Sequence, residues 1–275
     1  MDPTLGGERG LALAVVSREL WRNRAYVGGG ALRELRRRYA GTGMGLAWHV
    51  ILPLVQVVVY LVVFSALIGS PRDGRAMSGY VVFLCSGLLP WFVLAECVGR
   101  GSLSLLANES YLKKLPIPES VFVAQSVTTA GYTLVVYVVA LLVLAVANGL
   151  PVRASWVLIP PVLLLFLAMC LGITLTLATL TVFFRDIAQV LPLFLQIWFW
   201  LTPIVYDPSA LWPWTERLVA YNPPSAYIMS IRQLLIDGSV PGPGAWGWMA
   251  GLALAACALG TSVLRALQSD LRDAL

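Results

Sequence analysis

The sequence has few charged residues. Only 12% of its 275 residues are Asp, Glu, Lys or Arg, whereas 59% are hydrophobic and the mean hydropathy is +0.79. Soluble globular domains average about 25% charged and about 45–50% apolar residues. The composition therefore excludes a soluble enzyme and an intrinsically disordered chain. One membrane span needs about 20 apolar residues, so the chain has room for six or seven spans but for no large domain outside the membrane.

Histidine, cysteine and lysine are also scarce. The one histidine excludes an HExxH site or a multi-histidine metal centre. The four cysteines lie in or beside apolar runs without CxxC spacing, so we expect neither disulfides nor a metal site. The two lysines, Lys113 and Lys114, do not follow a glycine, so the P-loop pattern GxxxxGK[ST] is absent. We expect no catalytic residue and no cofactor in this chain.

What is present is a series of long apolar runs. They cover residues 44–68, 80–99, 120–147, 156–184, 188–206 and 245–267 approximately. We therefore expect an all-α membrane protein with six transmembrane helices in residues 44–275, preceded by a cytoplasmic segment 1–43. With both termini in the cytoplasm, fourteen Lys and Arg residues lie inside and five outside, which follows the positive-inside rule. The excess of basic residues is thus a topology signal, and we expect no nucleic-acid partner.

The N-terminal segment is rich in arginine. Residues 11–39 alternate apolar and basic side chains, which is typical of an amphipathic helix lying in the membrane interface. The triplet Gly28, Gly29 and Gly30 is expected to divide this helix in two. A plain stop signal before the first span is the alternative interpretation.

The segment between the fifth and sixth spans is unusual. Residues 207–244 are too apolar for a solvated loop and too often interrupted by proline to cross the bilayer twice. Short re-entrant helices on the outer side fit this composition, because irregular backbone at membrane depth needs cover from protein or a water-filled cavity.

Charge inside the spans is almost absent, with Glu96 as the only candidate, whereas aromatic residues are frequent. Intramembrane charge usually marks ion-driven carriers, so we expect another protein to supply the energy. Aromatic rings stack on the apolar faces of sugars, and an aromatic path suits a sliding polysaccharide. The candidate channel residues are Trp48, Tyr60, Phe64, Trp91, Phe194, Trp198, Trp200 and Tyr206. Each could equally be a core or lipid-facing aromatic.

Several stretches, taken in order, resemble one known family. They are residues 45–64, 83–91, 104–118, 184–192, 201–206 and 221–223, and together they extend over about residues 40–265. The chain resembles the membrane (permease) subunit of bacterial polysaccharide ABC exporters, the ABC-2 type transporters. The ordered set carries the resemblance, since no single motif is decisive.

The resemblance implies a homodimer in the bacterial cell (inner) membrane, docked on two copies of a cytoplasmic ABC ATPase that binds Mg-ATP. The implied substrate is a lipid-linked polysaccharide of the O-antigen, teichoic acid, capsule or galactan type. This chain would form the transmembrane channel and would not itself be an enzyme.

The resemblance also assigns roles to residues. The cytoplasmic segment that couples to the ATPase matches Asn108, Glu109, Ser110, Tyr111, Leu112, Lys113, Lys114 and Leu115, with Tyr111 and Leu112 as apolar anchors. Arg185 and Asp186 match the second cytoplasmic turn, as an ion pair or a minor coupling contact. The cations Arg33, Arg36, Arg37 and Arg38 are suited to loading a lipid diphosphate.

Two other functions remain open. One is an ABC-2 permease for a lipid or drug, against which the aromatic content weighs modestly. The other is a multi-pass glycosyltransferase, which would need clustered carboxylates that the segment 207–244 lacks.

Overall fold

All regular elements that the structure describes are helices, as the sequence predicts. The computed structural model describes residues 4–38, 43, 47–68, 74–207, 217 and 219–274. Its elements are α1 (Thr4–Arg22), α2 (Arg24–Arg38), α3 (Trp48–Ile68), α4 (Gly74–Gly101), α5 (Ser104–Ala107), α6 (Glu109–Lys114), α7 (Glu119–Ala147), the 3₁₀ helix η2 (Ala154–Leu158), α8 (Ile159–Phe183), α9 (Asp186–Leu201), α11 (Pro223–Arg232), the π-helical turn η4 (Gln233–Asp237) and α12 (Pro243–Ala274).

Each of the six apolar runs corresponds to one helix, namely α3, α4, α7, α8, α9 and α12. Four helical stretches in the described residues are long and apolar enough to cross a membrane: Gly79–Gly101, Glu119–Ala147, Ala154–Phe183 and Pro243–Leu271. Shorter apolar stretches lie in α3 (Ile51–Tyr60) and in α9 (Asp186–Leu201). The described residues therefore support a multi-pass membrane protein, and the count of six spans remains a prediction.

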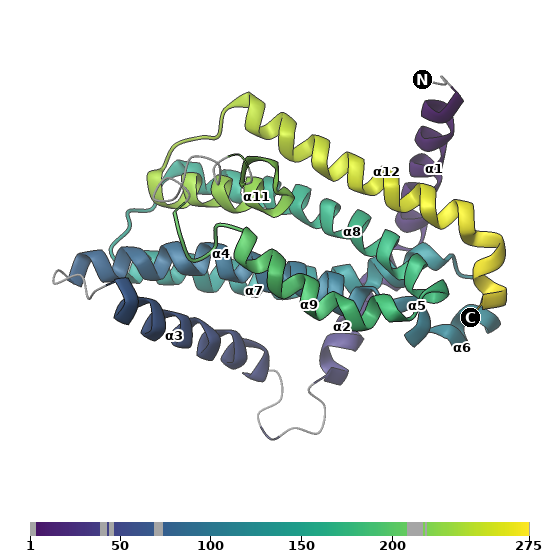
Figure 1. Cartoon of the computed structure of the whole chain (residues 1–275), viewed down its shortest axis with the longest axis horizontal. Coiled ribbons are helices and arrows are strands. Elements are labelled where there is room, and N and C mark those ends of the chain that lie inside the picture. Colours follow the sequence, from purple (N-terminus) through teal and green to yellow (C-terminus); the bar gives the residue numbers. More distant parts are fainter. Residues whose placement is uncertain are drawn as a thin grey trace.

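The long helices lie side by side along the longest axis of the molecule (Figure 1). Helix α8 packs along α12 and also contacts α4 and α7, while α2 lies against α7. Both chain ends and the short helices α5 and α6 lie at one end of the bundle, and α11 lies at the other (Figure 1). The two termini therefore lie at the same end, and their cytoplasmic location remains a prediction.

Glycine permits the close approach of α8 and α12. A Cβ atom on Gly172 of α8 would overlap the backbone of Ala256 and Cys257, and one on Gly260 of α12 would lie 2.5 Å from the backbone carbonyl oxygen of Gly172. Backbone atoms cannot move aside as a flexible side chain can, so neither position has room for a larger residue.

We expect Gly172→Ala to lower the free energy of unfolding by about 1–3 kcal/mol, because the added methyl group forces the two helices apart. The matched control is Gly251→Ala on α12, where no atom lies within 4 Å of the new Cβ and alanine favours the helix. Thermal unfolding of both variants in detergent measures the difference. Equal melting temperatures would contradict this packing.

The break in the N-terminal helix is not where the sequence analysis put it. Helix α1 ends at Arg22 and α2 begins at Arg24, so the break is at Asn23, whose side-chain amide donates to the carbonyl of Glu19 at 2.8 Å. The glycine triplet lies within α2. A Cβ on Gly30 would overlap the side-chain amide of Gln125, so this glycine serves the packing of α2 on α7 and does not end the helix.

Some expectations fall outside the described residues. These are the links 39–42 and 44–46, the turn 69–73, residues 208–216, and the side chain of Phe64. In the described part of segment 207–244, α11 and η4 are the expected short helices. Their position relative to a bilayer remains a prediction.

Candidate functional site: a basic cavity at the α5–α6 end

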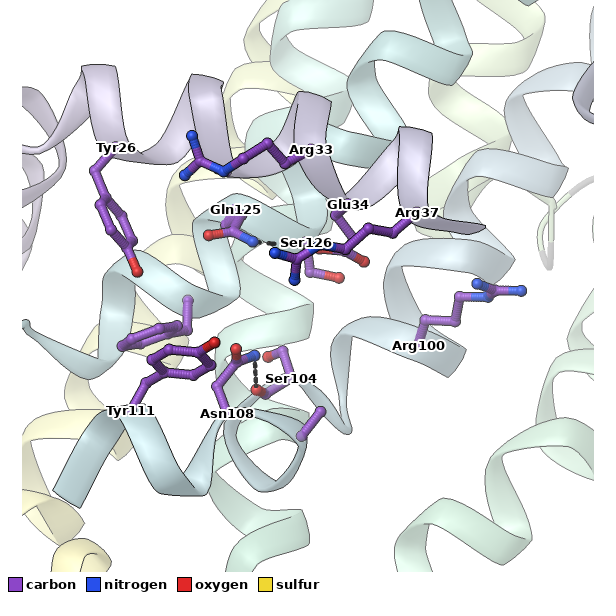
Figure 2. A pocket seen from close by; sticks show the side chains of 13 residues that line it. Tyr26, Arg33, Glu34, Arg37, Arg100, Ser104, Asn108, Tyr111, Gln125 and Ser126 are labelled. Atoms are coloured by element: carbon purple, nitrogen blue, oxygen red, sulfur yellow. Dashed lines mark hydrogen bonds between the residues drawn. The ribbon is translucent and has the colours of Figure 1, made fainter. Parts of the chain in front are cut away.

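A cavity of about 360 Å³ lies between α2 and the end of the bundle that carries α5 and α6. Figure 2 shows α2 on one side, Asn108 and Tyr111 on the opposite side, and Gln125 and Ser126 of α7 between them. Its lining also includes Tyr26, Gly30, Arg33, Glu34, Arg37, Arg100, Ser104, Ala107 and Phe122. The cavity therefore joins two segments, the Arg-rich helix and the coupling segment, that the sequence analysis assigned to different roles.

The cavity carries a positive charge. Arg33 and Arg37 lie one turn apart on α2, and Arg100 comes from the end of α4 (Figure 2). Within the described residues, none of these three guanidinium groups takes part in an ion pair. The carboxylate in the lining, Glu34, accepts from Arg38 at 2.8 Å and from Gln125 at 3.5 Å. Planar guanidinium groups with free donors suit phosphate oxygens.

A neutral hydrogen-bonding group in the lining also lacks a partner. The hydroxyl of Ser104 is buried and makes no hydrogen bond to any of the residues that the structure describes. Its neighbour Asn108 donates from the side-chain amide to the Ser104 carbonyl at 2.7 Å, which fixes the junction of α5 and α6 (Figure 2). An orphaned hydroxyl beside three arginines indicates a place for an acceptor-rich ligand.

The other two arginines assigned to phosphate loading lie elsewhere. Arg38 pairs with Glu96 of α4 and with Glu34, so its guanidinium is already neutralised within the chain. Arg36 is exposed and does not line the cavity. The structure thus brings Arg33 and Arg37 together with Arg100, and it separates Arg36 and Arg38 from them.

The coupling segment forms one short helix. Residues Glu109–Lys114 make α6. The helix ends before Pro116, as expected, because proline disrupts a helix interior. Lys113 donates to Glu109 at 2.7 Å, and this bond together with the lysine charge lowers the pKa of the Glu109 carboxyl. Lys113 and Lys114 are exposed, as is Ser110.

The apolar anchors of this segment differ from the expected pair. Leu112 is only 1% exposed and packs in a cluster with Leu105, Phe122 and Leu175 inside the chain, so it cannot contact a partner. Tyr111 is 51% exposed, as expected, and Leu115 is 38% exposed. The apolar groups on this surface are therefore Tyr111 and Leu115.

Arg185 lies in the short turn after α8, Asp186 is the first residue of α9, and both are exposed. The described residues include no salt bridge between them. The charge of Arg185 makes a small contribution to the lowered pKa of Glu109, which indicates that this turn lies near α6. The two turns could therefore contact one partner together.

Most of the candidate channel aromatics gather between α3, α4 and α9. Ring centroids are separated by 5.6 Å for Tyr60 and Phe199, 6.0 Å for Trp91 and Trp198, and 5.3 Å for Phe194 and Trp198. Trp91 is packed in the core, whereas Phe194 and Trp200 are about half exposed. Only the exposed members could contact a ligand from within a single chain.

The other two described candidates lie apart from this aromatic group: Trp48 at the start of α3 and Tyr206 after the end of α9. The Tyr206 hydroxyl donates to the Trp200 carbonyl at 3.1 Å, so it is tied to the end of α9. Trp48 is the first residue of α3 and is half buried. Within the described residues, ring contacts join Tyr60, Trp91, Phe194, Trp198 and Trp200 around Phe199, and a sugar path along the eight candidates remains a prediction.

The sequence analysis missed several residues of these sites. The packing of α2 on α7 adds four residues to the cavity lining: Tyr26, Arg100, Ser104 and Gln125. In the aromatic group, the missed residue is Phe199, which is buried at its centre. Helix spacing could not have separated Arg36 from Arg33 and Arg37, because Arg36 and Arg37 are three and four residues after Arg33 and both spacings place side chains on one face.

Comparison with known proteins places this geometry in context. Residues 31–236 match the family model described as "ABC-2 type transporter". A curated relative from Myxococcus xanthus named "O-antigen export system permease protein RfbA" is 28% identical over 226 residues, covering 82% of this chain and 85% of the relative. One of the same name from Klebsiella pneumoniae is 27% identical over 76% of this chain and 79% of the relative. "Polysialic acid transport protein KpsM" from Escherichia coli is 21% identical over 85% and 90%.

Proposed function

The chain belongs to the ABC-2 type transporter family, and we propose that it exports a lipid-linked polysaccharide whose diphosphate enters the basic cavity between α2 and α6. It is a multi-pass protein of the bacterial inner membrane and the permease subunit of a polysaccharide exporter. The glycan would be of the class that the relatives' names describe, such as O-antigen or polysialic acid.

The cavity is the observation that carries this proposal. Within the described residues, three arginines without carboxylate partners, a buried hydroxyl without a hydrogen bond and the amide of Asn108 together offer donors to the oxygens of a diphosphate. The lining includes Arg100 of α4 and Gln125 of α7, which are both helices with long apolar stretches. A lipid tail could therefore remain in the bilayer while the charged head is held by protein.

Energy for transport would come from an ABC ATPase partner, which membership of this family implies. We propose that two ATPase copies, each binding Mg-ATP, dock on Tyr111, Leu115, Lys113 and Lys114, with Arg185 and Asp186 as a second contact. The exposed lysines favour an acidic groove on the partner. Closure of the ATPases would then move α5 and α6, which form one wall of the cavity.

A homodimer with six spans per chain would complete the channel. The faces of α3 and α9 remain apolar and exposed in one chain, with Val55, Val62, Leu193 and Ile197 all more than half exposed. A second copy or lipid must cover these faces. The half-exposed Phe194 and Trp200 would then lie at the junction between the two copies, with both termini in the cytoplasm.

A permease for a drug or a free lipid is the alternative within the same family. The names of the relatives favour a polysaccharide, and three arginines suit a diphosphate better than an apolar drug. A glycosyltransferase has no support from the family match.

We expect Arg33→Ala combined with Arg37→Ala to reduce export at least about tenfold, because each charged hydrogen bond contributes about 1.5–3 kcal/mol. Lipid-linked glycan should accumulate in the membrane fraction while surface polysaccharide falls. Gels of both pools, from cells that produce the variant in place of the natural chain, measure the effect.

The control is Arg36→Ala, which removes one positive charge from the same helix outside the cavity. Equal export by the two variants would overturn the diphosphate site. Unchanged surface polysaccharide in cells lacking the chain altogether would overturn the function itself.

A further inference from the structure

Two adjoining cavities lie at the other end of the bundle, formed by α11, η4 and the start of α12. Their volumes are about 430 Å³ and about 380 Å³, and they share Asp207, Met229 and Gln233 in their linings. Figure 1 shows α11 at the end of the long helices opposite α5 and α6. These cavities are therefore far from the basic cavity, and no role described above uses them.

An exposed aromatic pair stands at the larger cavity. Trp248 lines the cavity and is 42% exposed, and the ring of Tyr221, which is 74% exposed, lies edge-on to it with centroids 6.5 Å apart. Trp and Tyr are enriched at membrane–water interfaces, because one side of the ring is apolar and the other carries a polar group. The C–H face of a pyranose ring stacks on such a platform.

One buried polar group in the larger cavity has no partner. Ser225 is 1% exposed, and its hydroxyl makes no hydrogen bond to any residue in the described part of the chain. Buried hydroxyls are almost always paired, so an orphaned one in a cavity wall indicates a missing ligand or water. The carboxylate of Asp207 and the amide of Gln233 line the same space.

The charges of the two cavities decide between classes of ligand. Asp207 and Asp237 contribute carboxylates. The cation in the lining, Arg232, donates to the carbonyls of Pro203 and Ile204 at 2.5 and 2.7 Å and so is occupied by the backbone. Among the described lining residues no cation is available, so a phosphate or an acidic sugar would be repelled, whereas neutral hydroxyl groups can donate to the carboxylates. The two cavities therefore suit neutral sugar units.

The walls are held in place by bonds that do not involve the cavity. The hydroxyl of Tyr227 on α11 donates to the carbonyl of Met249 on α12 at 2.7 Å, one residue beyond Trp248. Asn222, which precedes α11, accepts from the indole of Trp198 at 2.7 Å. Preorganised walls of this kind reduce the entropy that a ligand must lose on binding.

We propose that these two cavities bind sugar units of the polysaccharide, with one pyranose ring stacked on Trp248 and its hydroxyls bonded to Ser225, Asp207 and Gln233. The inference rests on the proposed function, because it takes the exported glycan as the ligand. Under the orientation proposed above, the site lies on the outer face and holds the chain as it leaves the membrane.

The test uses the complete exporter in nanodiscs, which expose both faces. The probe is the glycan of the host cell's own surface polysaccharide, released from its lipid by mild acid, so that no diphosphate is present to occupy the basic cavity. Saturation-transfer NMR titration gives the dissociation constant. We expect saturable binding, weakened about three- to tenfold by Ser225→Ala, which corresponds to one lost hydrogen bond.

Ser225→Ala distinguishes binding from structure. Because the hydroxyl makes no hydrogen bond to the described residues, its removal should leave the melting temperature unchanged or raise it, so weaker binding cannot be ascribed to unfolding. Trp248→Ala should weaken binding further, and Trp21→Ala, an exposed tryptophan at the opposite end, should not. Binding that is absent in the natural chain, or equal in all variants, overturns the site.

The same complexes separate this inference from the proposed function. If export proceeds normally but Ser225→Ala and Trp248→Ala bind the glycan as the natural chain does, only the outer site is wrong. If cells lacking the chain still export the polysaccharide, the proposed function is wrong, whatever the binding experiment shows.

Discussion

Replacing Tyr111 and Lys113 together by alanine is expected to reduce polysaccharide export to the level of cells that lack the chain. Tyr111 is 51% exposed and Lys113 is exposed on α6, so they are available to a partner surface. Truncation of an exposed aromatic anchor and its neighbouring cation commonly removes most of a contact's free energy. Neither side chain supports the core, and we expect the chain to reach the membrane in normal amounts.

The measurement is ATPase activity and export from the same reconstituted complexes. Uncoupling predicts continued ATP hydrolysis without export, whereas a lost interface predicts that the ATPase no longer co-purifies. Tyr111 also lines the basic cavity, so Lys113→Ala alone, which is outside the cavity, separates docking from ligand binding. Full export by the double variant would mean that the coupling segment lies elsewhere.

Leu112→Ala provides the contrast within the same helix. Its side chain is buried among Leu105, Phe122 and Leu175, and loss of a buried leucine costs about 2–5 kcal/mol. This variant should lower the amount of folded protein, which the Tyr111 and Lys113 changes should not.

The sequence predicts the helices of this fold well because their signals are local. Apolar runs of 20 residues, prolines such as Pro116 and Pro118, and the charged turn at Arg185 are all read without knowledge of packing. The ends of α7 and α8 agree with the predicted runs within about three residues.

The glycine triplet illustrates where local reasoning fails. Gly28, Gly29 and Gly30 disfavour a helix in isolation, but α2 lies against α7, and this packing outweighs their low propensity. Because Gly30 has no Cβ, the side chain of Gln125 fits against it. Only the contact between two segments a hundred residues apart decides the outcome.

The sequence also did not predict which groups the charged residues would contact. Arg38 was grouped with its neighbours as a phosphate ligand, yet its charge pairs with Glu96 of α4, the single acidic residue predicted to lie within a span. Arg100 was read only as a topology signal and lies in the basic cavity. Arginines on the same helix therefore have different roles, because they lie next to different neighbouring elements.

Arg232→Ala is expected to have the largest effect on stability, lowering the free energy of unfolding by about 3–5 kcal/mol. The sequence analysis counted this residue among the cations of an outer loop, but it is 5% exposed. Its guanidinium lies 3.6 Å above the ring of Phe83 and donates to backbone carbonyls of α4 and of the segment after α9. Removal would leave buried carbonyls without a donor.

The lysine variant and a glycine variant make the prediction specific. Arg232→Lys keeps the charge but lacks the planar fork that reaches several acceptors, so its melting temperature should lie between those of Arg232→Ala and the natural chain. Gly87→Ala should destabilise through the same contact, because its Cβ would lie 2.8 Å from the guanidinium of Arg232.

The control for this series is Arg265→Ala. The side chain of Arg265 is 36% exposed and lies 3.9 Å from Glu19, an arrangement that contributes at most about 1 kcal/mol. In thermal unfolding in detergent, the melting temperatures of Arg232→Ala and Arg265→Ala should therefore differ by several degrees. Equal melting temperatures would mean that the carbonyls after α9 find other donors. A large difference would mean that the bonds of Arg232 to α4 and to the segment after α9 hold α11 in place.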